Sequence, residues 1–120
     1  MNTQEVADQL VQYCREGKNV DAINTLYDEN IVSKEPAGAP REITTGKDNV
    51  LAKTKGWLES VAEIHGGVIS DPIVTGNHFA VTMEMDVTYK EYGRMPMHEV
   101  AVFEVKNGKI VAEQFFYNMG

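Results

Sequence analysis

Three long stretches in the last third of the chain alternate between apolar and polar residues: His78–Lys90, Met95–Lys106 and Lys109–Asn118. A period of two is typical of β-strands with one buried face. The pairs Tyr92-Gly93 and Asn107-Gly108 separate the stretches, and both favour tight hairpin turns. The sequence therefore predicts an antiparallel sheet whose apolar face needs a cover, and a partly covered curved sheet makes a pocket.

The first half of the chain supplies that cover. Apolar residues recur at helical spacing over Thr3–Glu16, over a short segment capped by Asn19, and over Lys47–Val61. A short strand is predicted at Ile31–Glu35 and a further one at Glu63–Thr75. This order predicts one α+β domain over residues 1–120, with three N-terminal helices covering a curved, mostly antiparallel sheet.

Composition restricts the function classes. The chain has 120 residues, 42% of them hydrophobic, without the run of about 20 apolar residues that a membrane span needs. A formal net charge of −7 argues against binding to nucleic acids or anionic membranes. The N-terminus lacks the features of a secretory signal, and the lone Cys14 suits a reducing compartment. We therefore expect a cytoplasmic protein.

The alternation places candidate site residues on one face of the sheet. If both Gly-containing pairs form two-residue turns, Val87 pairs with His98, and Val102 pairs with Glu113. The predicted helix-facing wall is then Met83, Met85, Val87, His98, Val100, Val102, Glu113, Phe115 and Tyr117. The opposite face carries Met97, Glu99, Ala101, Phe103, Val105, Ile110, Ala112, Gln114 and Phe116. That face is too apolar for open water, so we expect a homodimer through the convex side of the sheet.

Glu113 is the leading candidate for chemistry. A carboxyl group among apolar neighbours loses solvation, and its pKa rises toward neutrality, which suits general acid-base catalysis. His98 beside Tyr117 would orient a ligand or shuttle a proton, although a histidine in a wet pocket rim explains the same pattern. Tyr13 and Trp57 would supply ring surface to a ligand, or simply pack in the core.

The sequence has no pattern that indicates a cofactor. Its histidines have no metal-binding spacing, and there is no glycine-rich phosphate loop or serine nucleophile elbow. We therefore expect no metal and no cofactor.

The order of the elements resembles the nuclear transport factor two-like superfamily, whose fold is an α+β cone. The segments HFAVTMEMDVTY and MPMHEVAVFEVKNGKIVAEQFFY are most similar to its SnoaL-like branch, the relatives of polyketide cyclases. The resemblance covers nearly the whole chain. It implies the fold, whereas the superfamily's reactions include isomerisation, cyclisation, hydration, dehydration and epoxide hydrolysis.

The ketosteroid isomerases allow a more detailed comparison. Their catalytic carboxylate comes directly before a proline, and the segment LYDENIVSKEP has Glu35 at that place. The two oxyanion-hole groups of those enzymes fall at Val11 and about Val100, and neither side chain can donate a hydrogen bond. The resemblance therefore implies a role for Glu35 but argues against the same steroid isomerisation.

Three functions remain open. The first is a cofactor-independent enzyme that acts on a small, largely apolar molecule, with Glu113 and Glu35 exchanging protons beside a methionine wall. The second is a noncatalytic ligand-binding or association module. The third is an epoxide hydrolase-like enzyme, whose relatives bridge two acids with an arginine, for which only Arg41 and Arg94 are plausible here.

Overall fold

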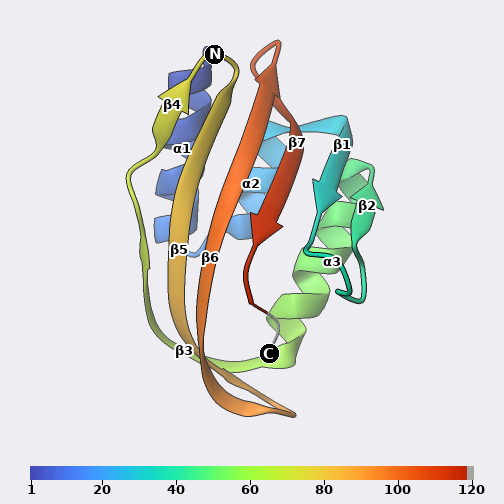
Figure 1. Ribbon diagram of the computed structural model, residues 1–120, viewed down its shortest axis with the longest axis vertical. Coiled ribbons are helices and arrows are strands. Elements are labelled where there is room, and N and C mark those ends of the chain that lie inside the picture. The colour runs from blue at the N-terminus through green and yellow to red at the C-terminus, as the bar shows by residue number, and fades with distance from the viewer. Residues whose placement is uncertain (119–120) are drawn as a thin grey trace.

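The computed structural model describes residues 1–118, in which three helices lie on one face of a curved seven-stranded sheet (Figure 1). The helices are α1 (Thr3–Arg15), α2 (Asn19–Leu26) and α3 (Lys47–Ser60). The strands are β1 (Tyr27–Lys34), β2 (Ile43–Thr45), β3 (Val61–Ile69), β4 (Ile73–Thr75), β5 (His78–Tyr89), β6 (Gly93–Lys106) and β7 (Lys109–Phe116). The predicted α+β class is confirmed.

The sheet has the strand order β2-β1-β7-β6-β5-β3, and β4 also pairs with β5. Every pairing is antiparallel except that between β1 and β7, which is parallel. We call the side of the sheet that carries the helices the inner face, and the opposite side the outer face.

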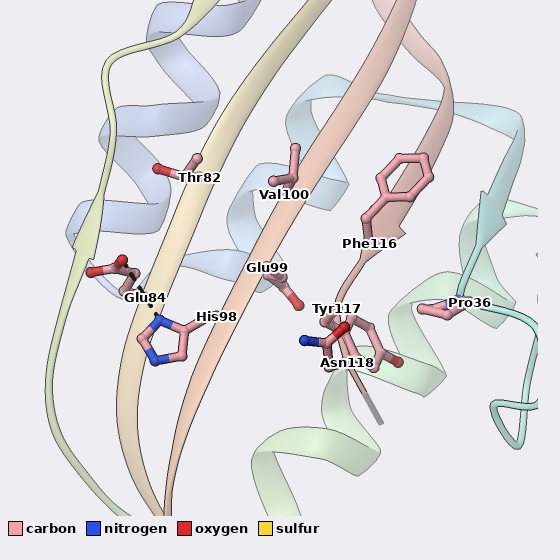
Figure 2. Close-up of a pocket in the computed structure, with 9 residues that line it drawn as sticks. All are labelled: Pro36, Thr82, Glu84, His98, Glu99, Val100, Phe116, Tyr117 and Asn118. Atoms are coloured by element: carbon pink, nitrogen blue, oxygen red, sulfur yellow. Dashed lines mark ion pairs between the residues drawn. The ribbon is translucent and has the colours of Figure 1, made fainter. Parts of the chain in front are cut away.

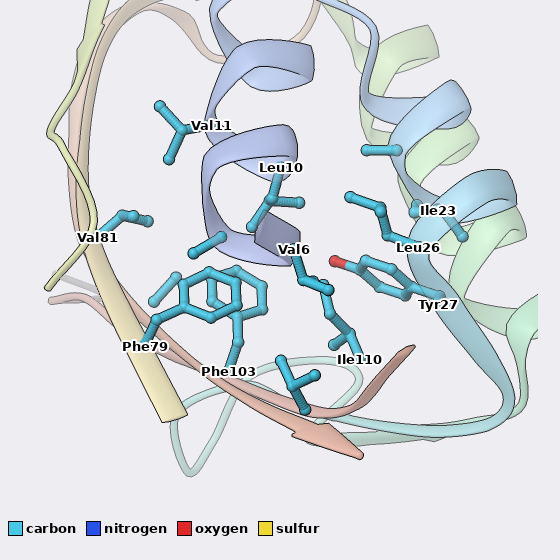
Figure 3. Close-up of a cluster of buried hydrophobic side chains, with 14 of the residues drawn as sticks. Val6, Leu10, Val11, Ile23, Leu26, Tyr27, Phe79, Val81, Phe103 and Ile110 are labelled. Carbon is cyan, nitrogen blue, oxygen red and sulfur yellow. The ribbon is translucent and has the colours of Figure 1, made fainter. Parts of the chain in front are cut away.

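The hydrophobic core fills one end of the inner face (Figure 3). The rings of Phe79 on β5 and Phe103 on β6 stack with their centroids 4.7 Å apart, and both side chains are buried. Val6 and Leu10 of α1 pack into the same cluster. They share one face of the helix because residues four apart are neighbours on its surface. Helix α1 therefore closes this end of the sheet.

Local sequence explains how α1 begins. The side chain of Asn2 accepts a hydrogen bond from the backbone N–H of Glu5, and the side chain of Glu5 accepts one from the backbone of Asn2. This capping box satisfies two backbone donors that have no partner inside the helix. The first predicted helix is confirmed to within one residue.

The predicted pairing of β5 with β6 is wrong. Val87 lies opposite Met95 and not opposite His98. Strand β6 begins at Gly93, whose positive φ of 81° suits glycine, so a three-residue connection replaces the expected two-residue turn. This odd shift in register moves every β6 side chain to the other face.

Two sets of β6 residues therefore lie on the faces opposite to those predicted. His98, Val100 and Val102 lie on the outer face, whereas Glu99, Ala101 and Phe103 lie on the inner face.

The turn between β6 and β7 forms as predicted, but a bulge follows it. Asn107 and Gly108 both have positive φ, as a type I′ turn requires, and Val105 pairs with Ile110. The register then shifts by one residue, so that Phe103 lies opposite Glu113. Because the bulge reverses the effect of the first shift, Glu113 and Phe115 face the helices as predicted.

Three further features differ from the sequence prediction. Strand β1 begins at Tyr27, before the predicted start at Ile31, and β2 lies between β1 and α3, where no strand is predicted. The predicted strand Glu63–Thr75 is divided into β3 and β4, with Pro72 in the gap. Within the described residues, no helix is long and apolar enough to cross a membrane.

Candidate functional site

Glu113 lies on β7 at the inner face and is only 4% exposed. Its carboxyl group accepts a hydrogen bond from the hydroxyl group of Tyr27. Ser33 reaches the same carboxyl group because β1 and β7 run parallel, which places Ser33 beside Glu113. Burial raises the pKa of Glu113, and the hydrogen bonds from Tyr27 and Ser33 oppose that rise.

Lys53 of α3 is a positive charge that acts on this carboxyl group. Its Nζ atom donates to Ser33 Oγ at 2.8 Å and to Glu35 Oε1 at 3.3 Å. The side chains of Lys53 and Glu35 are each only 17% exposed, so their ion pair is poorly screened by water. The ammonium group also lies 5.6 Å from the ring centroid of Phe115.

Glu35 has one unsatisfied oxygen. Its Oε2 atom is buried and has no hydrogen-bond partner among residues 1–118. A buried carboxylate oxygen without a donor is costly, and it is a place where a ligand could provide the missing hydrogen bond.

Glu99 is a site residue that the sequence analysis missed. It lies on β6 opposite Met83, on the inner face, and is half-buried. Burial, and then the negative charges of Glu35 and Glu113, raise the pKa of Glu99 to about 7, while Lys53 acts against the rise. The alternation along β6 places Glu99 on the inner face only if the connection before β6 contains three residues, as it does here.

The three carboxyl groups of Glu35, Glu99 and Glu113, together with the ammonium group of Lys53, form a unit that we call the acid cluster. The negative charges of Glu35 and Glu113 raise the pKa of Glu99, and the charge of Glu35 also raises the pKa of Glu113. Because the pKa of Glu99 is about 7, its carboxyl group can both give and accept a proton at neutral pH, as general acid-base chemistry requires.

Aromatic side chains adjoin the acid cluster. Burial and the neighbouring carboxylate of Glu35 raise the pKa of Tyr117 to about 12, so its hydroxyl group stays protonated and can donate. Trp57 Nε1 donates to the hydroxyl group of Tyr89 at 3.1 Å, and that hydroxyl group donates to the sulfur of Met97 at 2.8 Å. These half-buried groups give a surface that is apolar with a few fixed polar points, as small-molecule sites have.

A hollow of about 520 Å³ opens on the outer face, next to the end of β7 (Figure 2). It is lined by Pro36, Thr82, Glu84, His98, Glu99, Val100, Phe116, Tyr117 and Asn118. Figure 2 shows the Glu99 carboxyl group pointing toward Tyr117 and Asn118. Because β7 ends at Phe116 while β6 continues, the sheet has a notch here, and Glu99 and Tyr117 connect the hollow to the acid cluster.

The structure brings some of the predicted site residues together. Glu113, Glu35 and Phe115 lie around Lys53, and Tyr117 lies near Glu35. Other predicted residues that are half-buried on the inner side of the molecule are Met83, Met85 and Trp57.

His98 and Val100 are the exceptions. Both are exposed on the outer face, where His98 Nδ1 lies 3.6 Å from Glu84 Oε1. The expectation that His98 faces the helices beside Tyr117 is therefore wrong, and the cause is the three-residue connection before β6. Tyr13 packs against the core, and its hydroxyl group donates to Thr25 at 3.4 Å.

The arginines expected for an epoxide hydrolase-like site lie elsewhere. Arg41 is exposed, and Arg94 pairs with Asp86 on the outer face at 2.6 Å. The cation between the interior acids is Lys53. The isomerase comparison changes as well, because the inward-facing residue near position 100 is the carboxylic acid Glu99 and not Val100.

Comparisons with known proteins agree with this architecture. The fold defines a nuclear transport factor two-like α+β protein: one such protein of unknown function from Burkholderia pseudomallei has a TM-score of 0.79 at 16% identity, over 98% of this chain and 92% of that chain. The model of the SnoaL-like domain matches residues 1–117, and the chain belongs to this family.

A similar solved structure is a Mesorhizobium loti protein named as a SnoaL-like polyketide cyclase. It is 36% identical, with a TM-score of 0.92 over 98% of this chain and 100% of that chain. A Bacillus subtilis protein named as an isomerase has a TM-score of 0.73 at 21% identity, over 98% of this chain and 90% of that chain, and shows the shared fold. No curated protein matches the chain.

Proposed function

We propose that this SnoaL-like protein binds a small, largely apolar molecule and catalyses proton transfer on it without a cofactor. The observation that carries the proposal is the acid cluster: Lys53 pairs with Glu35 and acts through its charge on Glu99 and Glu113, and Glu99 has a pKa of about 7. Isomerisation, cyclisation, and addition or removal of water all need such a transfer. The similarity to proteins named as a cyclase and an isomerase supports the same class of reaction.

Each acid has a distinct part in this proposal. Glu99 is half-buried, so it can meet the ligand and exchange a proton with it near neutral pH. Glu35 pairs with Lys53 and offers its unpaired Oε2 to a hydroxyl or amine group. Glu113, which is deeper and bound by Tyr27, is a second proton store that couples to Glu99. Tyr117 donates to a developing negative charge on the ligand.

The ligand lies against the half-buried thioether and aromatic side chains of the inner face in this proposal. Met83, Met85 and Met97 lie next to one another on β5 and β6. Thioethers adapt their shape to different ligands, so this wall would accept more than one apolar skeleton.

The experiment measures exchange of carbon-bound hydrogen for deuterium in D₂O, by NMR, on a panel of small ketones, enones and epoxides. We expect the wild-type protein to accelerate exchange in at least one ketone or enone. Glu99→Gln should lower that rate ~10²–10⁴-fold, the usual contribution of one acid-base group. Glu113→Gln should also lower it, whereas Glu91→Gln, at an exposed site in the β5–β6 connection, should not.

A noncatalytic ligand-binding module is the second candidate, and one observation favours it. Glu113 is almost fully buried and is held by Tyr27, which is also what a structural carboxyl group would show. In that case members of the panel would bind, as detected by a shift in thermal unfolding, but none would exchange. Exchange at the same rate in wild-type and Glu99→Gln proteins would remove Glu99 from the mechanism.

A further inference from the structure

We infer that the ligand of the acid cluster is an organic cation, a small apolar body with an ammonium group that lies between Glu35 and Glu99. This inference rests on the proposed function, because it names the class of ligand for the same site, and it goes further because the proposed reaction leaves the charge of the ligand open. Three features of the site support it: an unused hydrogen-bond acceptor, an excess of acidic groups, and neighbouring aromatic rings.

The unused acceptor favours a ligand that donates hydrogen bonds. Glu35 Oε1 accepts a hydrogen bond from Lys53 Nζ at 3.3 Å, whereas Glu35 Oε2 is buried and has no partner within residues 1–118. A carboxylate oxygen accepts hydrogen bonds and cannot donate them, so a ligand that satisfies this oxygen must carry an N–H or O–H group. Hydrogen bonds between ionised groups are stronger than neutral ones, which makes an ammonium group the better donor here.

The charges of the site also favour a cation over a neutral donor. The three carboxyl groups of the acid cluster act on one another beside a single ammonium group, that of Lys53. Beyond the effect of burial, the charge of Glu35 raises the pKa values of both Glu99 and Glu113, so a further negative charge in this space is unfavourable. A bound cation relieves this repulsion, whereas a bound anion adds to it.

The charge of the whole chain acts in the same direction at longer range. Its formal net charge is −7, so its field attracts cations and repels anions before they reach the site. The acid cluster and the molecule around it therefore select for the same sign of charge on the ligand.

Aromatic rings near the acids suit both parts of such a ligand. Phe115 already lies 5.6 Å, measured from its ring centroid, from the ammonium group of Lys53. Trp57 and Tyr89 are half-buried and are joined by a hydrogen bond of 3.1 Å, which fixes their rings. The faces of aromatic rings attract ammonium groups, and the rings also bury apolar surface. An apolar amine therefore matches the site better than a neutral apolar molecule does.

The first test compares ligands of nearly equal shape and different charge: cyclohexylmethylamine, cyclohexylmethanol and cyclohexanecarboxylate. Binding at neutral pH is followed by NMR of ¹³C-labelled methionine methyl groups, because Met83 lies opposite Glu99 and Met85 lies opposite Met97. We expect the ammonium ion to bind about tenfold more tightly than the alcohol, and the carboxylate to bind more weakly than either. An ammonium ion that does not bind, or that binds no more tightly than the alcohol or the carboxylate, would overturn the inference.

The variants Glu35→Gln and Lys53→Met test the role of charge in opposite directions. Glu35→Gln removes a negative charge and keeps the shape of the side chain, so the preference for the ammonium ion over the alcohol should fall about tenfold. Lys53→Met removes the competing cation, so the same preference should rise. Glu91→Gln, at an exposed site in the β5–β6 connection, is the control and should keep the wild-type preference. A local loss of packing would shift both variants in the same direction, and such a result would contradict the inference.

The pH dependence of binding tests the part of Glu99. A bound cation favours the ionised form of Glu99, so the affinity for cyclohexylmethylamine should rise as the pH increases through about 7. A primary amine, like the side chain of lysine, stays protonated over this range. The rise should be smaller in Glu99→Gln, and an equally steep rise in that variant would overturn the place given to Glu99.

The other titratable and charged groups around Glu99 do not produce the same rise on their own, with one exception. These groups are Glu35 after β1, Lys53 on α3, Glu113 on β7, Cys14 on α1 and Tyr117 after β7. Burial raises the pKa of Cys14 to about 11 and that of Tyr117 to about 12, so both stay protonated near neutral pH. The exception is Glu113, whose pKa is also raised by burial, and the comparison with Glu99→Gln separates the two acids.

None of these measurements depends on turnover, so failure of this inference and failure of the proposed reaction can be told apart. A preference for the ammonium ion without hydrogen exchange in any ketone or enone would support the inference and contradict the reaction. Exchange by a protein that binds the alcohol at least as tightly as the ammonium ion would support the reaction and contradict the inference.

Discussion

The two ends of the inner face are built from the same strands but have opposite character. At one end, Phe79, Val81 and Phe103 are almost completely buried under α1 (Figure 3). At the other end, the same strands carry Met85, Met97 and Glu99, which are all half-buried. Along β6 the exposure of the inward-facing side chains rises from Phe103, at 1%, to Met95, at 42%.

The difference shows what the helical cover decides. Under α1 the inward side chains of β5 and β6 are apolar, because an unpaired polar group would have no compensation there. Glu113 is buried directly opposite Phe103, on the neighbouring strand β7, and Glu99 lies further along β6, toward the other end. Tyr27, Ser33 and Lys53 satisfy part of the hydrogen-bonding and charge requirements of the carboxyl groups. One face thus provides both the stability of the fold and the raised pKa values of the candidate site.

We call the end of the inner face that lies under α1 the closed end, and the end with Met85, Met97 and Glu99 the open end. The largest expected effect tests the closed end. Phe103→Ala removes a fully buried ring that stacks on Phe79, so the free energy of unfolding should fall by about 3–5 kcal/mol. Met95→Ala is the control on the same strand and face, at the open end, and should cost less than about 1 kcal/mol. Urea denaturation measures both values, and similar losses would contradict the division of the inner face into two ends.

The pH dependence of stability tests the open end. The pKa of Glu99 rises from 4.5 to about 7 on folding, so the folded protein binds this proton more tightly than the unfolded chain does. The free energy of unfolding should therefore fall as the pH rises between these two values, by ~2–3 kcal/mol from Glu99 alone. Urea denaturation across this range would show the fall.

Glu99→Gln provides the internal check on this prediction. The variant should show a flatter pH profile, because glutamine does not titrate, while Glu91→Gln should keep the wild-type slope. A profile that is equally steep in the Glu99→Gln variant would assign the slope to another group, with Glu113 as the first alternative, since its pKa is also raised.

The smallest expected effect concerns the charge balance of the acid cluster. Lys53 lowers the pKa of Glu99, so Lys53→Met should raise that pKa above about 7 without unfolding the protein. Lys55→Met, at an exposed position on the same helix, should leave it unchanged. NMR titration of ¹³C-labelled glutamate gives both values, and a lower pKa in Lys53→Met would show that Lys53 does not act through its charge.

The site could be predicted only in part from the sequence. The prediction places Glu113 correctly on the inner face because two errors in register cancel. The connection before β6 and the bulge in the β6–β7 pairing each exchange the two faces of the sheet, so together they restore the predicted face. The same first error placed His98 inside and Glu99 outside. Lys53 gave no signal, because a lysine on an amphipathic helix is usually solvated, and its partners Ser33 and Glu35 lie far away in the chain.

The sequence alone determined the α+β class, the three helices, the long C-terminal strands and the Asn107-Gly108 turn. These features depend on local periodicity and turn chemistry, which neighbouring residues express without help from the rest of the chain. Only the tertiary structure decided which β6 side chains face the helices and that Lys53 meets the acids of β1 and β7. Strand side chains alternate with a period of two, so a single extra residue in a connection or bulge exchanges the two faces, and packing of the whole sheet selects between them.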